Sequence, residues 1–129
     1  QALVHLLNGG ALADAAAAAV TGIPDHRVSE AVLAAAAMTR DEVAAGGFVL
    51  ETVGASFWAL ANFPTAEEII VEAVSLGEDA DSTGAVAGAL AGAAFGAEAL
   101  PDRWRDQVQY RDELIEQADR ILALSGSHR

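Results

Sequence analysis

Two aspartates and two hydroxyl residues follow one another in the stretch Gly77–Gly84, whose sequence is GEDADSTG. Asp79 and Asp81 are two residues apart. On a helix this spacing points side chains in nearly opposite directions, whereas in an extended loop it points them to the same side. Ser82 and Thr83 add hydroxyl oxygens. Carboxylate and hydroxyl oxygens on one loop are typical ligands of hard cations such as Mg²⁺, Mn²⁺ and Ca²⁺, so the first interpretation is a divalent-cation site.

A second interpretation of the same stretch needs no metal. Asp and Ser are preferred helix N-caps, and acids favour the positive end of the helix dipole, so Asp81 or Ser82 could simply cap the next helix. The same dipole repels a cation, and both acids would be needed to offset it. The spacing of Asp79, Asp81 and Thr83 also matches the first ligand positions of an EF-hand calcium loop. The last position of that loop needs a bidentate Glu, but here it is Leu90. The spacing therefore argues against an EF-hand and leaves the metal and capping interpretations open.

Glycine recurs every fourth residue after the acidic stretch, at Gly84, Gly88, Gly92 and Gly96. On a helix this spacing makes one bare stripe. Each interior glycine costs about 1 kcal/mol relative to alanine, a cost that close backbone packing can offset. We expect a helix over about 82–96 that runs through the centre of a bundle, with its stripe against a neighbouring backbone. The alternative is that the stripe only reflects a composition rich in Ala and Gly.

The rest of the chain has helical periodicity, with no alternating pattern typical of strands. Capping-box spacings at Thr39/Glu42 and Thr65/Glu68 mark two helix or turn starts. The expected helices cover about 2–7, 12–20, 28–38, 50–61, 65–76, 82–96 and 111–124. In the last helix the apolar face is expected to be buried; its members are Leu114, Ile115, Ala118, Ile121 and Leu122. The fold class predicted from these patterns is all-α.

Composition sets limits on partners and location. The chain has 129 residues, 53% of them hydrophobic, no cysteine and a net charge of −12, and its seven basic residues are all arginine. This balance argues against a nucleic-acid binder. The lack of cysteine excludes disulfides and fits a reducing compartment, so we expect a cytoplasmic location. The uncharged segment 82–97 is shorter than the roughly 20 residues that span a bilayer, so no membrane partner is expected.

Several segments together resemble one family. The stretch Gly77–Gly92, GEDADSTGAVAGALAG, resembles the C-terminal signature of ADP-ribosylglycohydrolases of the dinitrogenase reductase-activating type. Gly47–Thr52 and Phe57–Leu60 resemble the family's glycine–aromatic turn and the helix after it. Leu100–Trp104 and Arg111–Leu114 resemble its closing segments. The likeness covers nearly the whole chain.

The resemblance implies a compact all-helical hydrolase with a binuclear Mg²⁺ or Mn²⁺ site. Such enzymes cleave the glycosidic bond between ADP-ribose and a protein side chain or a small conjugate, and nucleic acid would be a partner only as an ADP-ribosylated substrate. Asp79, Asp81 and Ser82 match the family's metal ligands, and Gly47 and Phe48 match its substrate-binding turn. For Phe48 the competing interpretation is packing in the core.

Some features of the family are missing or altered. The family's N-terminal half carries a Thr-Asp-Asp-Thr-like motif with further metal ligands, which this sequence lacks, and Glu78 stands where the family commonly has Gly. We therefore expect residues 1–129 to be the C-terminal portion of a longer domain, inactive alone, with catalytic residues outside it. Glu51 is either close to the site or a solvated helical acid. The alternative function is a non-catalytic metal-binding, ADP-ribose-binding or structural protein of the same fold.

Overall fold

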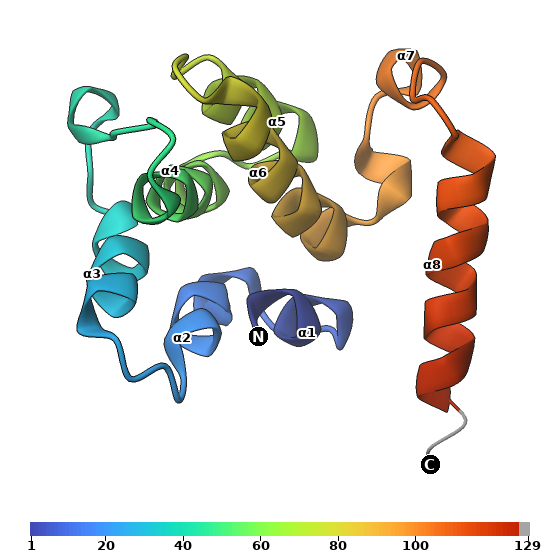
Figure 1. The fold of residues 1–129 in the computed structure, drawn as a ribbon, viewed down its shortest axis with the longest axis horizontal. Coiled ribbons are helices and arrows are strands. Elements are labelled where there is room, and N and C mark those ends of the chain that lie inside the picture. The colour runs from blue at the N-terminus through green and yellow to red at the C-terminus, as the bar shows by residue number, and fades with distance from the viewer. Residues whose placement is uncertain (127–129) are drawn as a thin grey trace. The chain divides into compact units, whose positions relative to one another are not determined.

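The computed structural model describes residues 1–126, and within that range the chain is helical without any strand (Figure 1). The predicted all-α class is confirmed. The helices are α1 (Ala2–Leu7), α2 (Ala15–Val20), α3 (His26–Ala35), α4 (Val49–Asn62), α5 (Ala66–Val74), α6 (Ala80–Phe95), α7 (Asp102–Arg105) and α8 (Arg111–Gly126), with 3₁₀ turns η1 (Leu12–Asp14), η2 (Arg40–Glu42) and η3 (Ala97–Ala99). The chain divides into two compact units, Gln1–Ala99 and Leu100–Arg129. Whether 1–129 is one segment of a longer domain stays a prediction.

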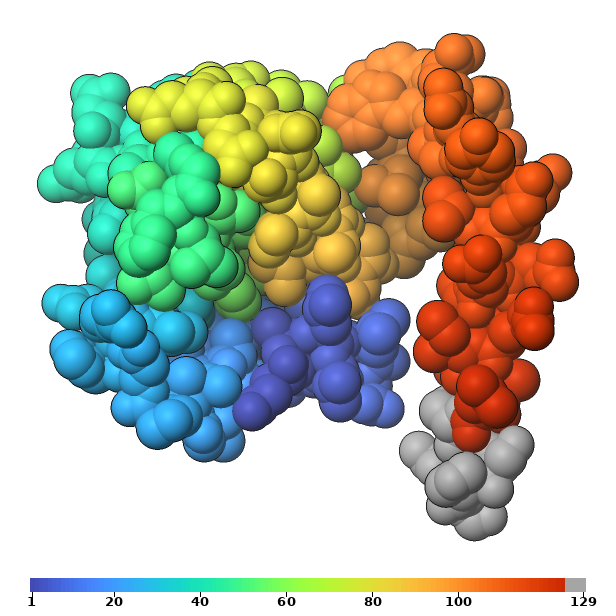
Figure 2. Space-filling model, in the orientation of Figure 1, coloured from blue at the N-terminus to red at the C-terminus, as the bar shows by residue number. Residues whose placement is uncertain are grey.

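In the unit Gln1–Ala99, α6 is the helix about which the others are arranged. It packs against α4, α5 and α1, and the further contacts α1–α2, α2–α3 and α3–α4 complete a ring of helices (Figure 1). The expectation that this helix is central is confirmed. In space-filling view the side chains of α4, α5 and α6 close against one another (Figure 2). Small buried residues, among them Ala87 and Ala91, allow α6 to approach its neighbours closely.

The core of this unit is built mostly of alanine, with a few larger side chains. Ile69 and Val32 are the largest fully buried apolar side chains. Trp58 is also buried; its Nε1 donates a hydrogen bond to the Met38 carbonyl oxygen at 3.1 Å, and its ring meets Phe63 edge-on at 5.3 Å between centroids. The indole N–H is thus satisfied inside the protein. Trp58 is therefore part of the core.

The glycine stripe of α6 does not face a neighbouring backbone, so that expectation is wrong. A Cβ built on Gly84 would lie 2.7 Å from Val74 Cγ2, and one on Gly88 would lie 3.9 Å from the Ile70 side chain. A Cβ on Gly92 would meet nothing within 4 Å. The reason is that α5 presents side chains, not its main chain, to this face of α6. The close backbone approach occurs elsewhere, at Gly54 of α4, where a Cβ would lie 3.3 Å from the Ala31 carbonyl oxygen of α3.

The connection between α3 and α4 is an irregular segment that is tied down at several points. The Arg40 guanidinium pairs with Glu72 and donates to the Ser75 carbonyl oxygen at 2.9 Å, at the end of α5. Asn62 and Trp58 side chains hold the start of the segment through the carbonyl oxygens of Ala36 and Met38. The segment is thereby fixed at its α5 and α4 sides, and it ends in the Gly46–Phe48 turn.

The unit Leu100–Arg129 consists of α7, α8 and their connections. The Arg103 guanidinium lies 5.1 Å from the centroid of the half-buried Trp104 ring. The apolar face of α8 is exposed, so the prediction of its burial is wrong; the exposed members are Leu114, Ile115, Ala118, Ile121 and Leu122. An amphipathic stripe is buried only where another element covers it, and the described residues of this unit supply no such cover.

Two alanine substitutions test this account of the glycines. Gly88→Ala is expected to raise the free energy of unfolding by up to about 1 kcal/mol, because alanine is the better helix former and the new Cβ has room. Gly54→Ala gains the same propensity but forces its Cβ against the Ala31 carbonyl, so we expect it to be less stable than Gly88→Ala by about 1–2 kcal/mol. Urea unfolding followed by circular dichroism measures both. Equal stability of the two variants would contradict the assignment of close packing to Gly54.

Candidate functional site

The Gly46–Phe48 turn and the acidic loop before α6 meet at one end of the unit Gln1–Ala99. The Asp79 backbone N–H donates to the Ala45 carbonyl oxygen at 3.1 Å. A Cβ built on Gly47 would lie only 3.6 Å from Asp79 Oδ2. Segments that are more than thirty residues apart in the chain are therefore in direct contact, and the structure brings together two of the predicted site residues, Gly47 and Asp79.

Asp79 and Asp81 are in contact with each other, although not in the way the spacing predicted. The helix α6 begins at Ala80, so Asp81 lies in its first turn and not in an extended loop. Asp79 precedes the helix with non-helical angles (φ −88°, ψ 58°), so the divergence of side chains along a helix does not apply to this pair. A side-chain hydrogen bond with Asp79, followed by the backbone N–H groups of Ser82 and Asp81, lowers the pKa of Asp81.

The capping interpretation is wrong in its simple form. The N-cap residue of α6 is Asp79, not Asp81 or Ser82, and its side chain makes no cap hydrogen bond. Asp81 lies in the first turn, where an acid interacts favourably with the positive end of the helix dipole. Ser82 is exposed beside it. The Asp79 carboxyl is thus not used to cap the helix.

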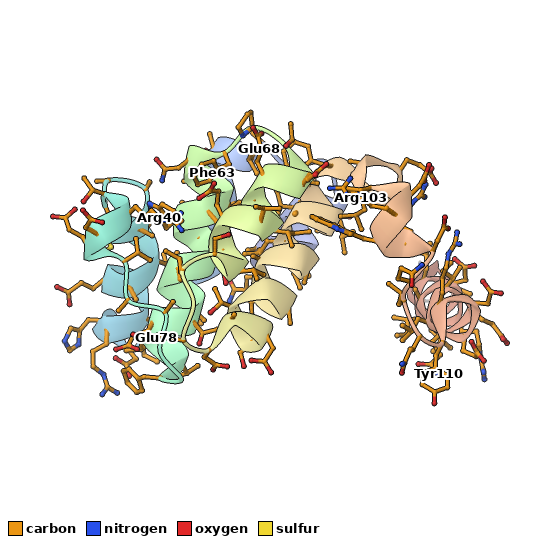
Figure 3. The ribbon with its side chains drawn as sticks, turned by 90° about the horizontal axis from the view of Figure 1, so that it is seen from above. Arg40, Phe63, Glu68, Glu78, Arg103 and Tyr110 are labelled. Carbon is orange, nitrogen blue, oxygen red and sulfur yellow. The ribbon has the colours of Figure 1, made fainter. Side chains whose placement is uncertain are left out.

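Two glutamates, Glu51 and Glu78, lie close to Asp79 and Asp81. These four carboxylates are called the acidic end of the unit. A Cβ built on Gly46 would lie 2.6 Å from Glu51 Oε2 and 3.1 Å from Glu78 Oε2, so both carboxylates border the same glycine. Figure 3 shows Glu78 beside the beginning of α4. Glu78 has φ +52°, in the left-handed region that favours glycine, directly after Gly77 at φ +84°. The backbone conformation explains why a glycine would suit position 78.

The acidic end has no basic partner among the described residues. No ion pair joins the carboxylates of Glu51, Glu78, Asp79 or Asp81 to an arginine within residues 1–126. In the same unit the Arg27 and Arg40 guanidinium groups are engaged elsewhere, with Asp25 and Glu72. Four carboxylates without a cation make a region of strong negative potential.

The oxygen donors of Asp79, Asp81 and Ser82 are of the type that a hard cation prefers, but they are too few to fill its coordination shell. Asp79, Asp81 and Ser82 offer only oxygen atoms, as Mg²⁺ and Mn²⁺ prefer. Within residues 1–126, however, no group of three or more His, Cys, Asp or Glu side chains converges as a metal site would require. The carboxylate pair is present, but metal binding by these residues stays a prediction.

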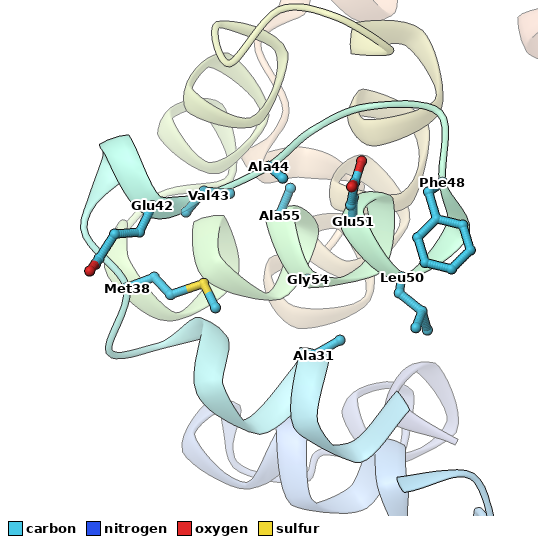
Figure 4. Close-up of a pocket in the computed structure, with 10 residues that line it drawn as sticks. All are labelled: Ala31, Met38, Glu42, Val43, Ala44, Phe48, Leu50, Glu51, Gly54 and Ala55. Carbon is cyan, nitrogen blue, oxygen red and sulfur yellow. The ribbon is translucent and has the colours of Figure 1, made fainter. Parts of the chain in front are cut away.

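Phe48 lies at the surface beside the acidic end. The residue is 55% exposed, so the alternative of core packing is wrong. Behind the turn is a pocket of about 270 Å³, with Phe48 and Glu51 towards one end and Met38 and Glu42 towards the other (Figure 4). The Glu42 carboxylate already accepts hydrogen bonds from Thr39 at 2.8 and 2.9 Å. Glu51 is half-buried in the wall of the pocket, so it is not simply a solvated acid.

A buried polar contact between α4 and α6 lies directly behind this site, and the sequence pattern alone did not single it out. Thr52, Ser56 and Thr83 are the buried polar side chains of the described chain. Ser56 Oγ lies 2.8 Å from the Thr52 carbonyl oxygen and 3.3 Å from that of Thr83. The available signal was the i, i+4 spacing of Thr52 and Ser56 inside an otherwise apolar helix.

Comparison with known proteins identifies the family. A model of the ADP-ribosylglycohydrolase family matches residues 1–129. The chain belongs to this family. The resemblance of the acidic signature and its flanking segments is thereby confirmed.

Three curated relatives are similar to part of the chain. It is 33% identical over 86 residues to the ADP-ribosylarginine hydrolase Tri1 of Serratia proteamaculans (strain 568), over 67% of this chain and 24% of the relative. It is 33% identical over 84 residues to the Tri1 of Pseudomonas putida (strain GB-1), over 65% and 23% of the two chains. The ADP-ribosyl-[dinitrogen reductase] glycohydrolase of Rhodospirillum rubrum is 39% identical over 64 residues, over 48% and 22%. The matched part spans about a quarter of the length of these relatives.

Within residues 1–126, none of the helices combines the length and the apolar character needed to cross a bilayer.

The strained backbone at Glu78 gives a prediction about stability. Glu78→Gly is expected to raise the free energy of unfolding by about 1 kcal/mol, because glycine adopts positive φ without steric cost. Glu78→Ala removes the same charge but keeps the strain, so it serves as the matched control. Urea unfolding of both variants measures the difference. If alanine stabilised the protein as much as glycine, the gain would come from the lost charge and not from the backbone.

Proposed function

We propose that this chain is the C-terminal portion of a longer hydrolase that removes ADP-ribose from a modified protein side chain, with arginine as the first candidate acceptor. Membership of the ADP-ribosylglycohydrolase family supports the reaction type. Two relatives named as ADP-ribosylarginine hydrolases support the acceptor. The observation that carries the proposal is the Asp79–Asp81 carboxylate pair, held against the Gly46–Phe48 turn and without a basic partner in the described chain.

In this proposal Asp79, Asp81 and Ser82 hold Mg²⁺ or Mn²⁺, as part of a site for two ions that further ligands outside residues 1–129 complete. Two ionised carboxylates in contact repel each other unless a proton or a cation lies between them. A cation-binding role explains why such a pair has no arginine beside it. The bound metal would supply Lewis-acid polarisation of the ribose and would position water.

The electrostatics of the acidic end also bear on the substrate. ADP-ribose carries an anionic pyrophosphate, which the carboxylates of Glu51, Glu78, Asp79 and Asp81 would repel. The proposed cations offset this repulsion, so substrate binding is expected to depend on metal. Phe48 offers an exposed aromatic ring beside the carboxylates, suited to contact the substrate, and Gly47 leaves room for close approach to the main chain. The general acid or base is expected outside this segment.

A second candidate function is a non-catalytic protein of the same fold that binds metal or ADP-ribose or serves a structural role. Its support is the lack of a convergent group of three metal-ligating side chains within residues 1–126, together with the extra carboxylate of Glu78 at the site. This alternative predicts that the parent protein lacks the Thr-Asp-Asp-Thr-like motif. An intact motif in the upstream sequence would contradict it.

The proposed reaction is tested on the full-length parent protein. With Mg²⁺ or Mn²⁺ we expect release of ADP-ribose from ADP-ribosylated arginine in a protein, and loss of this release after chelation of the metal. ADP-ribosylated serine and ADP-ribosylated DNA serve as competing substrates, with free ADP-ribose measured by chromatography. No release from any of the three would overturn the hydrolase proposal.

The proposed metal ligands are tested by calorimetric titration of Mn²⁺ into the full-length protein. Asp79→Asn and Asp81→Asn are each expected to abolish binding of at least one ion, because each removes a charged ligand. Ser82→Ala is expected to have a milder effect, since it removes a neutral ligand. Glu51→Gln removes the same charge from the same end of the protein and is the control, with only a small expected change. Unaltered binding in both Asp variants would show that the pair is not a metal site.

A further inference from the structure

The hydroxyl of Thr83 is an unsatisfied polar group in the interface between α4 and α6. Thr83 is 0% exposed, and its Oγ1 has no hydrogen-bond partner. A threonine inside a helix usually bonds the carbonyl oxygen three or four residues earlier, but Thr83 Oγ1 does not. Burying an unpaired hydroxyl costs stability, whereas valine would fill the same space without that cost. Packing alone therefore does not account for a threonine here.

The neighbours of Thr83 connect it to the candidate site on two sides. Its own N–H donates to the Asp79 carbonyl oxygen at 3.1 Å, which ties the first turn of α6 to the residue that precedes the helix. On the other side, Ser56 Oγ approaches the Thr83 carbonyl oxygen at 3.3 Å, and Thr52 Oγ1 approaches the carbonyl oxygen of Gly46 at 3.4 Å. Thr83 thus lies between the acidic loop before α6 and the helix α4, which follows the Gly46–Phe48 turn.

We propose that Thr83 is a positioning residue for Asp79. Its hydroxyl is the hydrogen-bond donor that orients the Asp79 carboxylate when this carboxylate binds a cation. In the structure described here Thr83 Oγ1 has no hydrogen-bond partner, so the hydroxyl is available for this bond. Carboxylates that ligate metals are generally held by such outer hydrogen bonds. The inference rests on the proposed metal-binding function of Asp79.

The test compares two substitutions of Thr83 in the full-length protein. Thr83→Val keeps the shape and removes the hydroxyl, while Thr83→Ser keeps the hydroxyl. For Thr83→Val we expect the Kd for Mn²⁺, measured by calorimetry, to rise about 10–100-fold, with resistance of the metal-free protein to urea unchanged or increased. Thr83→Ser is expected to restore the Kd to within a few-fold of the parent value. Thr21→Val, the same chemical change at an exposed position at the end of α2, is the control with an unchanged Kd.

The outcomes separate this inference from the proposed function. If the parent protein binds Mn²⁺ and Thr83→Val binds it equally well, the positioning role is overturned while the metal site stands. Equal weakening by Thr83→Val and Thr83→Ser, or a weakening that follows a loss of stability in urea, also overturns it, because the effect would then be one of packing. If the parent protein neither binds Mn²⁺ nor releases ADP-ribose, the proposed function fails and the inference fails with it.

Discussion

The contact between α4 and α6 is the constraint on which the rest of the site depends. The two helices begin at the same end of the unit Gln1–Ala99, because α5 returns the chain to that end before α6 starts. The hydrogen bond from the Asp79 N–H to the Ala45 carbonyl oxygen then joins the loops that precede them. Small residues such as Ala87 and Ala91 permit the close approach that this geometry requires. Without that approach the glycine turn and the acidic loop would not meet.

The same geometry explains how so many carboxylates can gather in one place. Glu51 and Asp81 both lie in the first turn of a helix, where the positive end of the dipole favours an acid. The two helix starts therefore reduce the cost of a negative cluster, although they do not neutralise it. The two arginines of this unit, Arg27 and Arg40, pair with Asp25 and Glu72 and not with this cluster. The proposed cation site would offset the charge that remains.

Two locally unfavourable features lie close to this acidic end. Glu78 has a backbone conformation that suits glycine, and the Thr83 hydroxyl is buried without a partner. In a chain whose core is otherwise simple and rich in alanine, such exceptions are more informative than the regular packing around them, because proteins tend to keep unfavourable local features where function needs them. Thr83 is the residue proposed to orient the ligand Asp79. Glu78 belongs to the turn that comes directly before Asp79.

The sequence by itself determined the all-α class, the bounds of α1 and the family, because periodicity, capping and a contiguous signature are short-range properties. Through the family resemblance it also predicted Asp79, Asp81 and Ser82 as metal ligands and Gly47 and Phe48 as substrate-binding residues. Only the tertiary structure decided which of these residues touch, that Gly54 and not the α6 stripe meets a neighbouring backbone, and that the apolar face of α8 is exposed. A pattern specifies which face of a helix can be buried, but whether it is buried depends on the element that packs against it, and that element is distant in the chain.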